Sequence, residues 1–162
     1  MLEKREMVNV LELTDRLTRG FLAGVVGGIL MDIISYISLK LNIANFHHTD
    51  WPALILFGQQ SANTVEVIFA MIIQLIFVGS LGILFTYLLT TLFSSENHLF
   101  KGWLFGVMSW FIIYVIASLA KFPELTPLDT GTAITDFVIA SVYGMVLAET
   151  IRWLENRTFK EI

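Results

Sequence analysis

The chain has 162 residues and is strongly apolar: 56% are hydrophobic, only 15% are charged, and the mean hydropathy is +0.73. Soluble domains are nearer a quarter charged, and a small soluble domain has too little interior to hide such an excess of apolar side chains. The composition therefore predicts an integral membrane protein. A net charge of −4 without a basic cluster argues against a nucleic-acid partner, and the lack of cysteine excludes disulfides and thiol chemistry.

The N-terminal segment, residues 1–19, mixes acidic and basic side chains. It lacks the apolar run and the small-residue cleavage site of a signal peptide. We therefore expect it to stay on the mature protein as a cytoplasmic segment that is either amphipathic or flexible.

Four long runs with few charges follow this segment. A helix rises ~1.5 Å per residue and the hydrocarbon core of a bilayer is ~30 Å thick, so about 20 apolar residues are needed to cross it. The runs are also too long and continuous for the strands of a barrel. The predicted fold class is all-α: one transmembrane domain over residues 1–162, built as a four-helix bundle. The predicted spans cover about 20–41, 66–93, 100–120 and 132–154.

The connections between the spans differ in character. Asp50, Trp51 and Pro52 favour a helix start, with Asp as the cap and Pro in the first turn, and the apolar stretch that follows is too short to cross a membrane. We therefore predict a short interfacial or shallow re-entrant helix in the first outer loop. The turn at 94–98 is brief, so the second and third spans are expected to be antiparallel neighbours. The second span exceeds a straight crossing and should tilt or protrude.

Lysines and arginines are distributed unevenly between the two sides of the predicted bundle. One side has only Lys40 and Lys121, and the other has the remaining eight basic residues. Cytoplasmic loops carry the excess of such residues, so the pattern predicts a multi-pass protein of the cell membrane with both ends in the cytoplasm. The eight are Lys4, Arg5, Arg16, Arg19, Lys101, Arg152, Arg157 and Lys160.

Small residues recur at intervals of four along the spans, as in the GxxxG pattern that lets two helix backbones approach closely. Tight packing inside the bundle is the favoured interpretation, and a dimer interface within the membrane is the alternative. The predicted helix-packing positions are Gly20, Gly24, Gly28, Gly79, Gly82, Gly102, Gly106 and Gly144.

Asp32 is the most informative polar residue, because it lies past the middle of the first span. An aspartate near a helix centre costs about 2.5–3.5 kcal/mol on insertion scales, so it should face the bundle or a water-filled cavity. It is either a functional residue or a structural one that joins two helices through Ser35, Tyr36 or Gln74.

The fourth span contains two acidic residues, Asp136 and Glu149, and crosses the membrane only if both lie near the interfaces or against protein. For Asp136 the favoured interpretation is capping of the first helical turn, where a carboxylate suits the helix dipole. The alternative is a shared outward pocket with Asp32, with Tyr143 on the same face. Glu149 is expected to form an interfacial ion pair with Arg152.

No cofactor is predicted, because none of the spans contains a histidine and no phosphate loop or nucleophile motif occurs. His47 and His48 are adjacent in the first outer loop, but two ligands in a loop are weak grounds for a metal site, and we expect them to be solvated. The candidate ligand or ion residues are Asp32, Asp136, Tyr36, Gln74 and Tyr143, and no metal site is predicted.

Several glycine and aromatic positions resemble those of the small four-helix bacterial membrane proteins of the YqhR type. The resemblance covers most of the chain from residue 20 to about residue 155 and implies a fold and a bacterial membrane location, but no established activity. It also implies an uncharged residue at the position of Asp32. The matching stretches are Gly20-Phe21-Leu22-Ala23-Gly24, Gly102-Trp103-Leu104-Phe105-Gly106 with Trp110, Phe122-Pro123-Glu124-Leu125, Thr132-Ala133-Ile134-Thr135 and Tyr143-Gly144.

Three function hypotheses follow. The first is a non-enzymatic structural or accessory membrane protein, with lipids as neighbours and either a homo-oligomer or a larger membrane complex as its assembly. The second is a small transporter or channel for protons, cations or a small solute, working through Asp32 and Asp136. The third and weakest is an intramembrane enzyme, because nothing places a nucleophile or metal beside the two aspartates.

Overall fold

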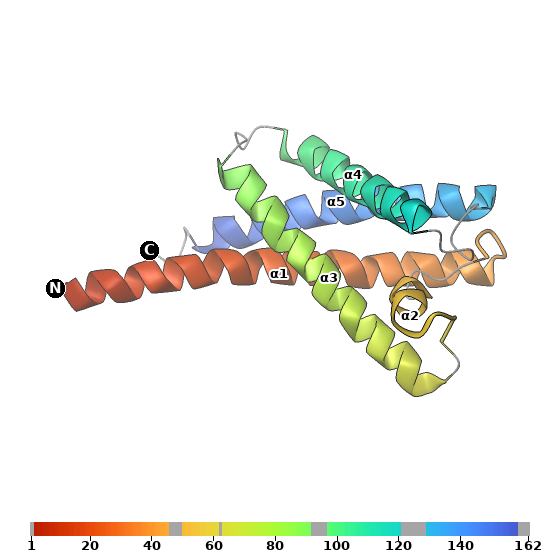
Figure 1. Cartoon of the computed structure of the whole chain (residues 1–162). Coiled ribbons are helices and arrows are strands. Elements are labelled where there is room, and N and C mark those ends of the chain that lie inside the picture. Colours follow the sequence, from red (N-terminus) through yellow and green to blue (C-terminus); the bar gives the residue numbers. More distant parts are fainter. Residues whose placement is uncertain (1, 46–49, 62, 92–96, 121–128, 159–162) are drawn as a thin grey trace.

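The computed structural model describes residues 2–45, 50–61, 63–91, 97–120 and 129–158. Within these ranges the regular structure is helical, and four of the helices contain apolar segments long enough to cross a membrane. This confirms the predicted all-α transmembrane fold with a short additional helix. The helices are α1 (Leu2–Lys40), α2 (Asp50–Phe57), α3 (Thr64–Thr91), α4 (His98–Leu119) and α5 (Thr130–Thr158), as Figure 1 shows.

Helix α1 includes the charged N-terminal segment, so residues 2–19 are helical and continuous with the first span. Its 39 residues make it roughly 58 Å long, about twice the thickness of the hydrocarbon core. Figure 1 shows its first turns extending beyond the other helices. The helix ends where Asn42 adopts the left-handed conformation (φ 54°) and the Ile43 N–H bonds to the Ser38 carbonyl at 3.0 Å. This is a Schellman cap with asparagine in place of the usual glycine.

The helices pack as a chain of pairs. Helix α1 packs against both α3 and α5, and α5 packs in turn against α4. Helices α3 and α4 hardly touch within the described residues, although they follow one another in sequence. The prediction that they are antiparallel neighbours is therefore wrong: Figure 1 shows α3 crossing α1 obliquely and diverging from α4.

Glycines explain why α3 and α4 separate. On the α1–α3 contact, a β-carbon added at Gly82 would lie 2.9 Å from the Cα of Gly24. On the α4–α5 contact, a β-carbon added at Gly106 would lie 3.0 Å from the Cα of Gly144. Each contact is a small-residue interface with backbone against backbone. The glycines thus favour close packing of α3 against α1 and of α4 against α5, rather than of α3 against α4.

The main core lies where α1, α3 and α5 meet, and α5 is the most buried of the four spans while α4 is the least. Its interior is filled mainly by Phe85 of α3 and by Ile139 and Leu147 of α5, all of them at most 2% exposed. Phe105 of α4 reaches this core and packs on Phe85 with ring centroids 4.9 Å apart.

The short helix α2 bridges α3 and α4 at the end of the bundle opposite the chain termini. Trp51 packs edge-on against Tyr114 of α4, with ring centroids 4.7 Å apart, and Leu54 contributes to the same buried cluster as Ala117. On the other side, Phe57 meets Phe69 of α3 at 6.4 Å. Helix α2 therefore covers the space that the divergence of α3 and α4 leaves.

Candidate functional site

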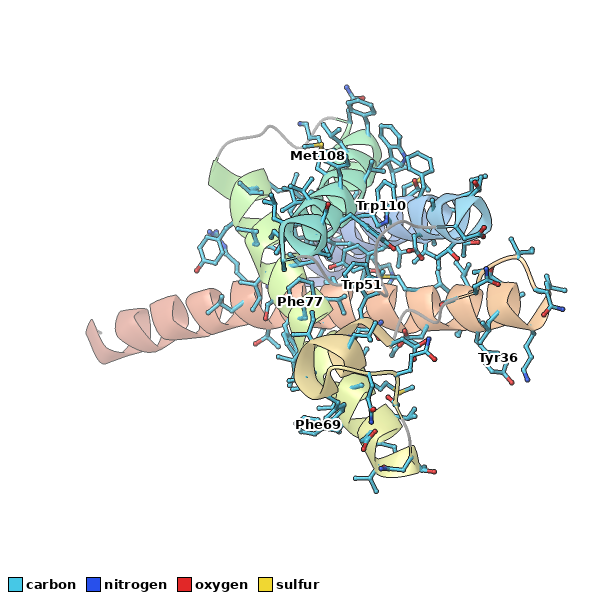
Figure 2. The ribbon with its side chains drawn as sticks, turned by 45° about the vertical axis from the view of Figure 1, so that its right-hand side comes forward. Tyr36, Trp51, Phe69, Phe77, Met108 and Trp110 are labelled. Atoms are coloured by element: carbon cyan, nitrogen blue, oxygen red, sulfur yellow. The ribbon has the colours of Figure 1, made fainter. Side chains whose placement is uncertain are left out.

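A cavity of about 220 Å³ occupies the space between α3 and α4, under α2. Its walls are almost entirely apolar and aromatic, with Trp51 from α2, Phe77 from α3 and Trp110 from α4 among them. Figure 2 shows these three side chains near one another at the centre of the molecule. Residues of α1 and α5, such as Met31 and Ala140, close it from behind. The arrangement makes an apolar cavity between two helices that contain candidate membrane spans.

Asp136 is the acidic residue that lines the cavity, and it is only 5% exposed. Its carboxylate accepts a hydrogen bond from the Tyr114 hydroxyl, which ties α5 to α4. Another residue caps α5: Asp129 directly precedes the helix, and its carboxylate accepts a hydrogen bond from the Gly131 N–H at 3.0 Å. The interpretation of Asp136 as a cap is therefore wrong, because it is the seventh residue of α5, nearly two turns in, and its carboxylate bonds to Tyr114 of α4.

Gln74 of α3 also lines the cavity and is 3% exposed. Its side-chain amide donates to Asp32 of α1 at 2.6 Å, so Gln74 is one of the three partners considered for Asp32. The other atom of the amide, Oε1, is buried and has no hydrogen-bond partner. An unsatisfied buried acceptor is costly, by about 1–3 kcal/mol, so this atom calls for an explanation.

Trp110, which also lines the cavity, carries a second buried polar atom without a partner. Its ring stacks edge-on against Tyr114 (5.4 Å) and Phe137 (6.0 Å), but its Nε1–H is buried without an acceptor. Gln74 and Trp110 thus both line the cavity with other parts of their side chains, while the two unpaired atoms themselves are covered by protein.

The structure brings three of the five candidate residues, Asp136, Gln74 and Tyr143, to the cavity. The Tyr143 hydroxyl donates to the Val78 carbonyl at 2.7 Å, so it joins α5 to α3. Asp32 reaches the cavity only through Gln74. Tyr36 is 54% exposed near the end of α1, away from the cavity, with the Lys40 ammonium 5.4 Å from its ring centroid.

The two histidines considered as metal ligands, His47 and His48, lie outside the described residues. Among the residues that are described, no group of three histidine or acidic side chains is placed to hold a metal ion. The lining of the cavity is suited to contacts with an apolar molecule.

The predicted helix-packing glycines all lie against other helices of the same chain. The first-span and second-span glycines meet across the α1–α3 contact, and Gly102 and Gly106 meet Gly144 across the α4–α5 contact. Gly27 was not singled out from the sequence, because it falls outside the four-residue series. Its absent side chain makes room for Tyr143, whose ring would lie 2.8 Å from a β-carbon there.

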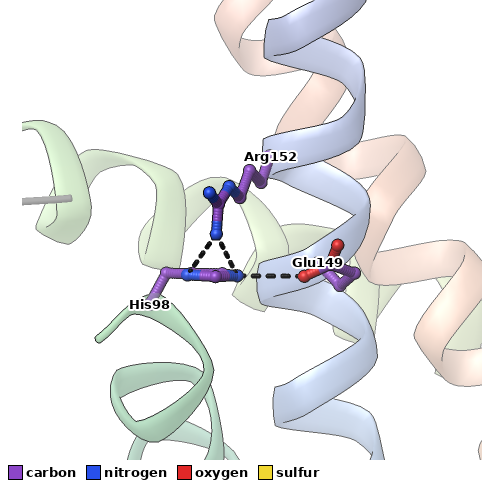
Figure 3. A network of polar contacts seen from close by, with 3 residues as sticks. All are labelled: His98, Glu149 and Arg152. Atoms are coloured by element: carbon purple, nitrogen blue, oxygen red, sulfur yellow. Dashed lines mark hydrogen bonds and ion pairs between the residues drawn. The ribbon is translucent and has the colours of Figure 1, made fainter. Parts of the chain in front are cut away.

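A second polar cluster joins α4 and α5 at the end of the bundle that holds the termini (Figure 3). His98 Nε2 lies 2.9 Å from Glu149 Oε2, and the Arg152 guanidinium lies 3.1 Å from His98 Nδ1. In the neutral tautomer with its proton on Nε2, His98 donates to Glu149 and accepts from Arg152. The expected pairing of Glu149 with Arg152 is therefore mediated by a histidine from the neighbouring helix.

Sequence reasoning missed the aromatic residues of the cavity. Trp51 was interpreted as part of a helix start near the membrane interface, and neither Trp110 nor Tyr114 was a candidate. One signal was available: Trp110 and Tyr114 are four residues apart, so they share one face of α4. A buried tyrosine or tryptophan usually has a hydrogen-bond partner, so this face of α4 was a place to expect a polar contact such as the one between Tyr114 and Asp136.

Four apolar helices in one bundle, with an apolar cavity between two of them, define a multi-pass helical membrane protein. The chain belongs to the family of conserved membrane proteins YqhR, whose family model matches residues 2–161. Neither the curated proteins nor the solved structures include a match to the chain. Membership of this family identifies the chain as a membrane protein and assigns it no specific role.

Proposed function

We propose that this protein is a non-enzymatic accessory membrane protein whose role depends on binding an acyl chain between α3 and α4. The observation that carries the proposal is the apolar cavity of about 220 Å³ that these two helices leave between them. Both flanking helices contain candidate membrane spans, so in a bilayer acyl chains would be the molecules most abundant at its opening.

Packing physics supports an occupied cavity. An engineered apolar cavity of about 150 Å³ in a soluble protein stays free of water and binds benzene or xenon, and this one is larger and also apolar. In a membrane no hydrophobic effect drives an acyl chain from the lipid into the cavity. The favourable free energy of binding comes instead from dispersion contacts with the cavity walls, which are lost when the cavity is empty. The aromatic walls from Trp51, Phe77 and Trp110 offer many such contacts.

The proposal is tested by photolabelling purified protein in lipid nanodiscs with a dodecane probe that bears a diazirine. We expect crosslinks to map to α3 and α4 residues of the cavity. Replacing Ser109, a small lining residue, by leucine fills the space and should reduce those crosslinks at least fivefold. The matched control is Ser80→Leu, the same change at an exposed position of α3 outside the cavity, which should leave labelling unchanged.

Two results would overturn this proposal. One is crosslinking spread evenly along the lipid-facing surfaces of α3 and α4, with no enrichment in the cavity. The other is an equal effect of Ser109→Leu and Ser80→Leu, because the cavity would then not be the site of labelling.

Proton or cation transport is a second candidate, supported by one observation. Asp136 lines the cavity, and Asp32 is hydrogen-bonded to Gln74, which lines it too, so both aspartates adjoin one cavity. Transport predicts that Asp32→Asn abolishes flux in proteoliposomes while the melting temperature is unchanged. Flux equal to that of empty liposomes with the unaltered protein would remove this candidate.

The orientation and the assembly are also proposals. The eight-to-two bias in basic residues supports both ends lying in the cytoplasm, and alkaline phosphatase fused after residue 162 should then be inactive in bacterial cells. The predicted homo-oligomer has lost one argument, because the glycines that suggested it lie against helices of the same chain. A larger membrane complex stays a prediction.

A further inference from the structure

The lining of the cavity is well exposed on one side and buried on the other. Ile55 of α2 and Phe77 of α3 line it and are 61% and 48% exposed, and Leu56 of α2 is an exposed lining residue too. Met31 of α1 and Tyr143 of α5 line it on the other side, and both are buried. The cavity therefore opens to the surroundings of the bundle beside α2 and closes where α1 and α5 pack.

Helix α2 has the features of a helix that lies at a membrane surface. It is at the end of the bundle opposite the chain termini (Figure 1), and its eight residues span roughly 12 Å, too little to cross a bilayer. It begins with the acidic Asp50, its middle is apolar, and it is followed by the exposed polar residues Gln59 and Gln60. Such a helix suits the level where headgroups meet acyl chains. The opening of the cavity thus adjoins the lipids of the leaflet on that side.

We infer that the occupant of the cavity is a phospholipid of this leaflet, which places the end of one acyl chain inside while its ester and headgroup stay beside α2. This inference rests on the proposed function and names the class and the orientation of its ligand. The cavity volume of about 220 Å³ is below the roughly 300–1,000 Å³ of pockets that enclose a whole small molecule, so it accommodates part of a chain. Polar ester atoms stay outside because apolar walls offer them too few hydrogen bonds.

The charges beside the opening bear on the headgroup. Helix α2 begins with Asp50, α3 has Glu66 in its first turn, and residues 50–91 include neither lysine nor arginine. This local excess of negative charge disfavours a headgroup that is itself anionic. A zwitterionic headgroup such as phosphoethanolamine has no net charge, and its ammonium group is complementary to carboxylates. We therefore expect phosphatidylethanolamine to be bound in preference to phosphatidylglycerol.

The test uses phosphatidylethanolamine probes in phosphatidylcholine nanodiscs, with a diazirine either at the methyl end of one acyl chain or beside its ester. We expect the methyl-end probe to label the buried lining residues, such as Val78 and Tyr143, and the ester-side probe to label α2. The methyl-end probe should exceed the ester-side probe in the buried lining by about fivefold or more, because the ester is held at the interface. A methyl-end phosphatidylglycerol probe should label the same residues less.

The entrance beside α2 is tested by substitution. Ile55→Trp narrows the opening and should reduce labelling of the buried lining by the methyl-end probe about fivefold, as crowding that costs roughly 1 kcal/mol would. The matched control is Ile68→Trp, the same change at a residue of α3 that is 54% exposed and lies outside the lining. Both positions are on the surface, so both variants should fold.

The outcomes separate this inference from the proposed function. Cavity labelling by the dodecane probe but not by the methyl-end phospholipid overturns the inference and leaves acyl-chain binding intact. Labelling of the buried lining by the ester-side probe as strongly as by the methyl-end probe also overturns it, as does a preference for phosphatidylglycerol. Equal labelling of the Ile55→Trp and Ile68→Trp variants overturns the entrance beside α2. No cavity labelling by any probe overturns both proposals.

Discussion

The two glycine contacts and the α3–α4 gap show opposite ways of joining helices in one small bundle. Across α1–α3 and α4–α5, glycines let backbones come within van der Waals contact. Between α3 and α4, the lining includes large side chains such as Phe77, Trp110 and Tyr114, and the helices diverge around a cavity. In a membrane, association depends on close packing rather than on hiding apolar surface from water. Glycines therefore permit the closest approach in the α1–α3 and α4–α5 pairs, and the space between α3 and α4 is the cavity.

The largest expected effect on stability comes from replacing a glycine in one of the two close contacts by a large residue. Gly82→Leu places a side chain against the backbone of Gly20 and Gly24, where no rotamer avoids a clash. We expect a loss of about 3 kcal/mol or more of folding free energy, at or above the upper end of overpacking costs. Thermal melting in detergent, followed by near-UV circular dichroism, measures it.

The control for this experiment is Ser80→Leu, two residues earlier on the same helix and exposed. It should change the melting temperature little, because surface substitutions usually stay within about 0.5 kcal/mol. Equal destabilisation by Gly82→Leu and Ser80→Leu would mean that the α1–α3 contact is packed no more tightly than the exposed surface of α3. The contrast drawn between the glycine contacts and the space between α3 and α4 would then be wrong.

A smaller effect is expected where a polar pair at the edge of the cavity joins α4 to α5. Tyr114→Phe removes the hydroxyl that donates to Asp136 and leaves a buried carboxylate with one donor fewer. The expected cost is about 1–3 kcal/mol. The double variant Tyr114→Phe with Asp136→Leu should recover part of it, since it removes both partners. Additive losses in this double-mutant cycle would show that the two side chains are not coupled.

The fold class could be predicted from the sequence, because long apolar runs can be accommodated in lipid by only a few architectures. The sequence was also sufficient for the glycine positions, because a four-residue interval describes a helix face. It failed on α3 and α4, where a short connection suggested neighbours. A connection constrains only the ends it joins, and the oblique crossing of α3 over α1 comes from residues such as Gly24 and Gly82.

The candidate site was predictable in part. Asp32 and Asp136 stood out because charge is rare within a span. Gln74 was among the partners predicted for Asp32, whereas Tyr114 was not predicted as the partner of Asp136. The cavity itself was not predictable, because it arises from the angle between two helices. Angles follow from packing across the whole contact rather than from any local pattern.

The smallest expected effect concerns the polar cluster that joins α4 to α5 beyond their glycine contact. His98→Ala removes the ring between Glu149 and Arg152, and we expect a loss of about 0.5 kcal/mol, because the Glu149 side chain is 61% exposed and solvent weakens such contacts. The loss should shrink further in 1 M salt, which screens exposed charges. Glu149→Gln is the control: it keeps an oxygen that accepts from His98, so it should cost less than His98→Ala. A salt-independent loss of several kcal/mol would instead mean that this cluster, and not the glycines, holds α4 to α5.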